Sequence, residues 1–197
     1  FKNKINFLRK CKKISFKYNG KNINLNSGSE HIRKNFIKYS KTNNYLIAFD
    51  GDADRVLIAK KNYGIIESEK LALIFGTYLK NKNFSKNKII VGTKIVNPWL
   101  KKQIINEGIK LKLSKVGDRN VLKEVKKNKA LFGFETSGHF SFNHMMDGIY
   151  AAGLFLKILN KNPLLIDRVL SLKINYKKII FGIERNKLIK VKKIYHV

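Results

Sequence analysis

Three aspartates at alternate positions are the side chains of this sequence best suited to chemistry. Asp50, Asp52 and Asp54 are separated by glycine and alanine, and such small residues let the chain fold so that the carboxylates face one point. Without a cation, the repulsion between these like charges would cost several kcal/mol at a low effective dielectric. A hard divalent cation removes that cost, and a site built only of oxygen ligands suits Mg²⁺ or Ca²⁺. The spacing therefore predicts a metal site.

A solvated acidic turn is one alternative explanation of these carboxylates. It is disfavoured because the loop follows the apolar run 45–49, which is typical of a buried strand, and functional loops lie at the carboxyl ends of such strands. A calcium EF-hand is excluded because its loop needs Gly at position six and Glu at position twelve, where this chain has Arg55 and Lys61. A phosphatase with an aspartyl nucleophile also has two aspartates, one residue apart, after a strand. It stays an alternative, weakened because Asp118 has no second acidic residue beside it.

Strand-like and helix-like stretches alternate along the chain and predict an α/β fold with layers. The expected strands are 14–18, 45–49, 55–59, 89–92, 109–113 and 130–134, and the expected helices are 5–11, 29–39, 67–79, 99–106, 119–126 and 148–159. A break at residues 61–64 predicts two layered α/β subdomains with mixed sheets. We expect a metal-loop domain at 1–62, a second domain at 63–162 and an unassigned tail at 163–197.

The charge balance suggests a polyanion as a partner. The chain has 42 Lys and Arg against 13 Asp and Glu, for a formal net charge of +29. Such an excess is typical of proteins that bind nucleic acid or anionic surfaces. Nearly all of it is lysine, spread evenly with many Asn and Ile, whereas arginine, the usual side chain for bidentate phosphate and base recognition, is scarce. We therefore expect only non-specific, salt-sensitive binding to nucleic acid, and a dedicated nucleic-acid-binding module is an alternative.

Cysteine usage and hydropathy bear on where the protein works. The only cysteine is Cys11, so no disulfide framework exists, and a reducing cytoplasm is expected. No apolar run reaches the roughly 20 residues that a membrane span needs, so no membrane partner is expected.

At the acidic loop the chain resembles the α-D-phosphohexomutases, whose metal loop is Asp-Gly-Asp-x-Asp-Arg. Further segments match the bacterial phosphoglucosamine mutases of this family, in order and approximate spacing, from about residue 18 to residue 159. The matching segments are 19–24 with 28–29, 92–93 with Asn97, 116–122, 133–139 and 147–149.

The resemblance implies an isomerase that converts glucosamine 6-phosphate to glucosamine 1-phosphate through a bisphosphate, a step in amino-sugar and cell-wall precursor metabolism. The family enzyme has four domains, with a phosphoserine in a Thr-x-Ser-His-Asn-Pro loop and a phosphate clamp of the form Arg-x-Ser-Gly-Thr. Neither motif occurs in this sequence. The chain is thus expected to correspond to part of the second domain and to the third domain, and to be inactive without the missing family domains. A non-catalytic remnant of the fold is the alternative.

The resemblance also assigns roles to the acidic loop. Asp50, Asp52 and Asp54 would hold Mg²⁺, which neutralises the transferred phosphate in a reaction that depends on positioning and charge. Arg55 is expected to hold a phosphate oxygen. The alternative is a salt bridge that keeps the aspartates in place.

The segment 133–139 looks like the sugar loop of the family. Glu135 and Ser137 together accept and donate hydrogen bonds, which suits sugar hydroxyls, and the glycines allow a tight turn. His139 is a candidate to relay a proton from the attacking hydroxyl, although a lone histidine is more often structural.

Two further positions bear on the substrate pocket. Asp118 and Arg119 look like a second substrate loop, although a helix N-cap and its ion pair would also explain them. Phe134 stands where the family usually has a small residue, and it is expected to alter the sugar pocket.

Overall fold

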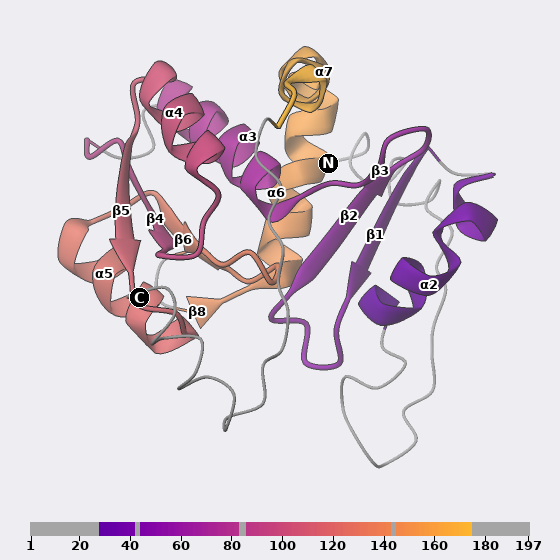
Figure 1. Ribbon diagram of the computed structural model, residues 1–197, viewed down its shortest axis with the longest axis horizontal. Coiled ribbons are helices and arrows are strands. Elements are labelled where there is room, and N and C mark those ends of the chain that lie inside the picture. The colour runs from indigo at the N-terminus through magenta and orange to yellow at the C-terminus, as the bar shows by residue number, and fades with distance from the viewer. Residues whose placement is uncertain (1–27, 42–43, 83–85, 143–144, 175–197) are drawn as a thin grey trace, which may run out of the picture.

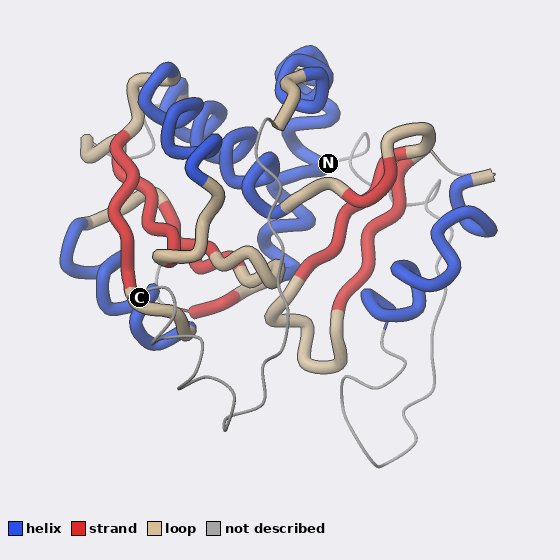
Figure 2. Tube along the Cα trace, viewed as in Figure 1, coloured by secondary structure: helices blue, strands red, loops and turns tan. Residues whose placement is uncertain are grey.

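The computed structural model describes residues 28–41, 44–82, 86–142 and 145–174, and the structural statements below concern these residues. The expected helix at 5–11, the expected strand at 14–18 and the matching segment 19–24 lie outside them. Figures 1 and 2 show two sheets, with helices on their faces and α6 between them.

The smaller sheet is antiparallel with the strand order β1-β2-β3. Its strands are β1 (Tyr45–Phe49), β2 (Val56–Lys60) and β3 (Gly64–Ile65). Because side chains alternate along a strand, Leu46 and Ala48 pack against α2 (Gly28–Ser40), whereas Tyr45 and Ile47 pack against the main core. The sheet therefore buries both faces, and its hairpin end carries the acidic loop.

The larger sheet has the strand order β5-β4-β6-β7-β8. Its strands are β4 (Ile89–Thr93), β5 (Lys110–Ser114), β6 (Phe132–Phe134), β7 (Phe140–Phe142) and β8 (Met145–Met146). The first three are parallel to one another, and β7 and β8 continue the sheet in antiparallel fashion.

Helices cover both faces of the larger sheet. They are α3 (Ser68–Asn81), α4 (Pro98–Asn106) and α5 (Asp118–Asn128). On the face of α3 and α4, the buried rings of Phe75 and Phe132 lie 6.3 Å apart. On the opposite face, Val91 of β4 packs with Val121 and Val125 of α5. The result is an α/β/α sandwich.

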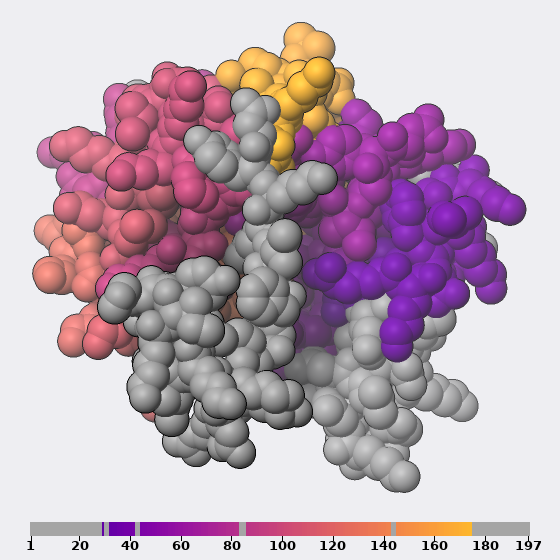
Figure 3. Space-filling view, in the orientation of Figure 1, coloured from indigo at the N-terminus to yellow at the C-terminus, as the bar shows by residue number. Residues whose placement is uncertain are grey.

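Two further helices join the sheets, and they are α6 (Gly148–Lys161) and α7 (Pro163–Ser171). The ring of Phe155 on α6 lies 5.6 Å from Tyr45 of β1, and the ring of Tyr150 lies 4.6 Å from Phe142 of β7. Helix α7 packs on α3 and α6. In Figure 3, α7 (yellow) lies at the top, between the purple surface of the smaller sheet and the magenta surface of the larger one.

The parallel strands place several loops at one edge of the larger sheet. Because β4, β5 and β6 run the same way, the loops 94–97, 115–117 and 135–139 all follow their carboxyl ends. Groups that bind ligands gather at such edges in α/β proteins.

The expected α/β class is confirmed, and the strands and helices expected at described residues are present with small shifts of their ends. Four elements were not expected, namely β3, β7, β8 and α7. Among the described residues, no helix is both long and apolar enough to span a bilayer.

Candidate metal and substrate site

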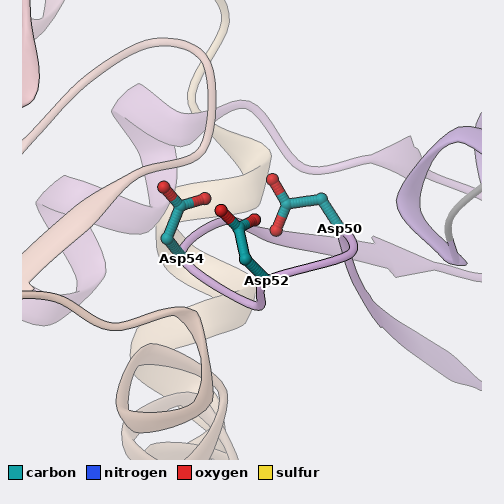
Figure 4. Close-up of side chains that lie close together, drawn as sticks. All are labelled: Asp50, Asp52 and Asp54. Carbon is teal, nitrogen blue, oxygen red and sulfur yellow. The ribbon is translucent and has the colours of Figure 1, made fainter. Parts of the chain in front are cut away.

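The acidic loop joins β1 to β2 and brings its three carboxylates together. Asp50, Asp52 and Asp54 each offer one oxygen, and these oxygens lie within 4.8 Å of one another. Figure 4 shows the three side chains on the same side of the loop. Ala53 takes the left-handed backbone conformation, with φ of 60°, and its N–H donates to the Asp50 carbonyl at 3.3 Å. This turn lets alternate side chains converge.

The carboxylate of Asp50 is buried close to a second negative charge, so its ionised form needs a compensating positive charge. Asp50 is 8% exposed, and this burial raises the pKa of its carboxyl, with a further contribution from the charge of Asp54. Arg55 compensates in part, since its backbone N–H donates to Asp50 Oδ1 at 3.1 Å and its Nε lies 3.0 Å from Asp50 Oδ2.

Two buried oxygens of the loop support the fit of a metal ion. Asp50 Oδ2 and Asp54 Oδ1 have no aligned hydrogen-bond donor among the described residues, although Arg55 Nε lies nearby. Buried polar atoms in native proteins are usually satisfied. A hard divalent cation binds such carboxylate oxygens, so the donor set fits Mg²⁺.

The 135–139 loop lies against the acidic loop. Arg55 Nε donates to His139 Nε2 at 3.1 Å, and Asp54 Oδ2 lies 3.3 Å from the same ring nitrogen. The backbones also meet, since the Val56 N–H donates to the Gly138 carbonyl at 3.1 Å. Residues far apart in the sequence therefore form one site.

Glu135 and Ser137 surround the other nitrogen of His139. Ser137 Oγ lies 2.8 Å and Glu135 Oε2 3.2 Å from His139 Nδ1. Because Nε2 accepts from Arg55, a neutral ring carries its proton on Nδ1 and donates it toward these oxygens. Glu135 is 7% exposed, and its Oε1 accepts from the Gly117 N–H at 2.8 Å.

Asp118 and Arg119 begin α5, next to the 135–139 loop but outside the cluster of contacts around His139. Gly117 is the N-cap residue of α5, so Asp118 is not the cap that the alternative explanation required. Both side chains are exposed, and neither forms an ion pair within the described part of the chain. Gly117, through its hydrogen bond to Glu135, connects this loop to the site.

The expectation that Phe134 alters the sugar pocket is wrong. Its side chain is fully buried on the α3 face of the sheet, where its ring stacks on that of Phe140 at 6.1 Å. The side chain before Glu135 therefore packs in the core, because neighbouring residues of a strand face opposite sides.

Sequence reasoning gave no role to Gly148, which also contacts the acidic loop. Its N–H donates to the Ala53 carbonyl at 3.0 Å, from the first turn of α6. The Asp147-Gly148 pair ahead of an apolar helix was the available signal.

Comparison with known proteins is consistent with this arrangement. Residues 67–186 match the family described as phosphoglucomutase/phosphomannomutase, alpha/beta/alpha domain III, a match that extends past residue 162. The chain is 40% identical over 144 residues to the phosphoglucosamine mutase of Carboxydothermus hydrogenoformans, which covers 71% of this chain and 32% of that protein. The chain thus spans about a third of the length of this curated relative.

Solved structures share the fold. A phosphoglucomutase/phosphomannomutase family protein of Burkholderia thailandensis has a TM-score of 0.65 at 22% identity, covering 74% of this chain and 32% of that chain. The N-acetylphosphoglucosamine mutase of Aspergillus fumigatus, solved with GlcNAc-6P and magnesium, has a TM-score of 0.58 at 14% identity, covering 73% and 39%. The family match covers more than half of the residues, and the chain therefore belongs to the phosphoglucomutase/phosphomannomutase family.

Proposed function

We propose that this chain forms the metal- and sugar-binding centre of a phosphoglucosamine mutase. In this proposal, residues 1–62 correspond to part of the second domain of the family enzyme and residues 63–162 to its third domain. The substrate is a hexosamine phosphate, glucosamine 6-phosphate, and the reaction is an intramolecular transfer of its phosphate.

The observation that carries the proposal is the contact between the acidic loop and the sugar loop. Arg55 Nε and His139 Nε2 lie 3.1 Å apart, although the residues are 84 positions apart in the sequence. A phosphate in transfer must lie close both to its metal and to the sugar hydroxyl, so the mechanism requires these two loops to meet.

The residues divide the chemistry among them. Asp50, Asp52 and Asp54 would hold Mg²⁺, which supplies charge neutralisation for the transferred phosphate. Glu135 and Ser137 bind and orient sugar hydroxyls. His139 is the candidate to take the proton that the attacking hydroxyl loses.

Named relatives support the choice of substrate and metal. The relative from Carboxydothermus hydrogenoformans is named a phosphoglucosamine mutase, and the Aspergillus fumigatus structure holds GlcNAc-6P and magnesium. The proposal extends this chemistry to the matching residues here, while the phosphoserine and phosphate-clamp motifs are absent from the sequence. We therefore propose that the chain binds but does not turn over substrate alone.

Magnesium binding tests the proposal directly. Saturating Mg²⁺ should raise the melting temperature, since a ligand at about 100 times its Kd adds roughly 2.7 kcal/mol of stability. Replacing Asp50, Asp52 and Asp54 together by Asn should abolish this rise. The matched control is Glu124→Gln with Asp167→Asn, which removes acidic groups of α5 and α7 and should leave the rise intact.

The outcome also separates the alternatives. A rise that persists in the triple variant contradicts the proposed metal site. A chain that folds but binds neither Mg²⁺ nor glucosamine 6-phosphate in calorimetry is the non-catalytic remnant.

A further inference from the structure

The first turn of α6 is built against the backbone of the acidic loop. Gly148 is buried, and its N–H donates to the Ala53 carbonyl at 3.0 Å. Ala53 is the left-handed residue of the loop, between Asp52 and Asp54. A hydrogen bond from α6 therefore fixes the peptide group between Ala53 and Asp54, and this peptide group helps to position the carboxylates of Asp52 and Asp54.

No side chain fits at position 148. A Cβ there would lie 2.5 Å from the Arg55 carbonyl oxygen and 2.7 Å from the Ala53 carbonyl oxygen. Both neighbours are backbone atoms, so they can move away only if the loop moves. Gly153 of the same helix is exposed and has nothing within 4 Å of its Cβ position.

The helix start is itself fixed and cannot yield easily. The Asp147 N–H donates to the Phe140 carbonyl at 2.8 Å, and Asp147 Oδ1 accepts from the Tyr150 N–H at 2.7 Å. Phe140 directly follows His139 and begins β7. Backbone hydrogen bonds thus connect the 135–139 loop to the acidic loop, from Phe140 of β7 to Asp147 and from Gly148 to Ala53.

We propose that Gly148 is a positioning residue for the metal centre, through which the larger sheet and α6 set the spacing of the acidic-loop carboxylates. This inference rests on the proposed Mg²⁺ site. Mg²⁺ demands near-ideal octahedral geometry at about 2.0–2.1 Å, whereas Ca²⁺ accepts irregular sites at about 2.3–2.6 Å. A displaced loop should therefore lose Mg²⁺ more than Ca²⁺.

The test compares Gly148→Ala with two control variants of the full 197-residue chain by calorimetry with Mg²⁺ and with Ca²⁺. Gly148→Ala should weaken Mg²⁺ binding roughly tenfold or more, as changes in the outer shell of metal sites do, and Ca²⁺ binding clearly less. Gly153→Ala adds the same methyl group in open space and should change neither affinity. Ile158→Val lowers stability within α6 without touching the loop, so it should also leave both affinities unchanged.

A measurement on the unaltered chain covers the case in which Gly148→Ala does not fold. In ¹⁵N NMR spectra, Mg²⁺ should shift the Gly148 amide signal together with those of Asp52 and Asp54, and leave Gly153 in place. If Asp52 and Asp54 shift without Gly148, or if Gly148→Ala folds and keeps its Mg²⁺ to Ca²⁺ affinity ratio, the positioning role is overturned and the metal site stands. If the unaltered chain binds no Mg²⁺, the proposed function and the positioning role both fall.

Discussion

At the scale of the residue, two roles were considered for Arg55, a salt bridge to the aspartates and a contact with a phosphate oxygen. Different parts of its guanidinium can fill these two roles. Its Nε contacts both loops, since it lies 3.0 Å from Asp50 Oδ2 and 3.1 Å from His139 Nε2. The contacts of its guanidinium with Asp50, Asp54 and His139 are made through Nε, and the side chain is 41% exposed. The same arginine can therefore support the aspartates and, through its exposed guanidinium, also donate to a phosphate.

We expect Arg55→Met to weaken binding of glucosamine 6-phosphate about tenfold or more, because hydrogen bonds between charged groups contribute roughly 1.5–3 kcal/mol. Mg²⁺ affinity should not fall, since the substitution removes a positive charge beside the carboxylates. NMR titrations with each ligand measure both effects. The control is Arg168→Met on α7, which removes the ion pair of Arg168 with Glu107, the residue that follows α4. Loss of Mg²⁺ affinity with unchanged sugar-phosphate binding would show that the salt bridge is the main role of Arg55.

At the scale of the element, the sequence was sufficient wherever a segment was long enough to show a period. The alternation of β1 and the apolar runs of α3 and α6 were predictable for that reason. The strands β3, β7 and β8 have two or three residues, too few for a pattern. Helix α7 does have a start signal in the sequence, an Asn162 N-cap followed by Pro163.

In the candidate site, too, some features could be predicted from a local sequence pattern and others could not. The acidic residues and the glycine-rich turn could be recognised from local spacing. The contact between Arg55 and His139, and the placement of Gly148 on the Ala53 carbonyl, depend on how two sheets and α6 pack. No local pattern encodes such long-range contacts.

Helix α7 is held in place by a buried lysine, which leads to a prediction about stability. Lys70 Nζ on α3 donates to the Leu170 and Leu172 carbonyls at 3.1 and 2.8 Å, at the C-terminal end of α7. Lys70→Met keeps the length of the side chain but leaves these carbonyls without their donor, at a cost of about 1–3 kcal/mol. Urea unfolding measures this difference in the free energy of unfolding.

The control is Lys60→Met on β2. It removes the ion pair of Lys60 Nζ with Oδ1 of Asp167, an exposed residue of α7. Exposed pairs contribute only about 0–1 kcal/mol, so this variant should be the milder one. Equal losses in both variants would mean that burial adds nothing to the Lys70 contact.

At the scale of the whole molecule, the fold brings the acidic loop of one sheet to the 135–139 loop of the other. Helix α6 packs on both sheets, and α7 adds the ion pairs of Asp167 to Lys60 of β2 and of Arg168 to Glu107 after α4. From the net charge of +29 we expect a weak, salt-sensitive attraction for polyanions, including phosphorylated ligands. Binding of a sugar phosphate therefore needs a control at raised salt, where only the specific part persists.

We expect the purified 197-residue chain to show no steady turnover of glucosamine 6-phosphate, even with Mg²⁺ and a hexosamine bisphosphate. The family motifs that carry the phosphoserine and clamp the substrate phosphate are absent from the sequence, and aligned positioning of reacting groups accounts for about 7–11 kcal/mol of such barriers. A coupled assay of glucosamine 1-phosphate measures the rate, with the phosphoglucosamine mutase of Carboxydothermus hydrogenoformans as the positive control. Steady turnover that disappears in Asp52→Asn would contradict this expectation, because it would place a complete phosphate-transfer site within these residues.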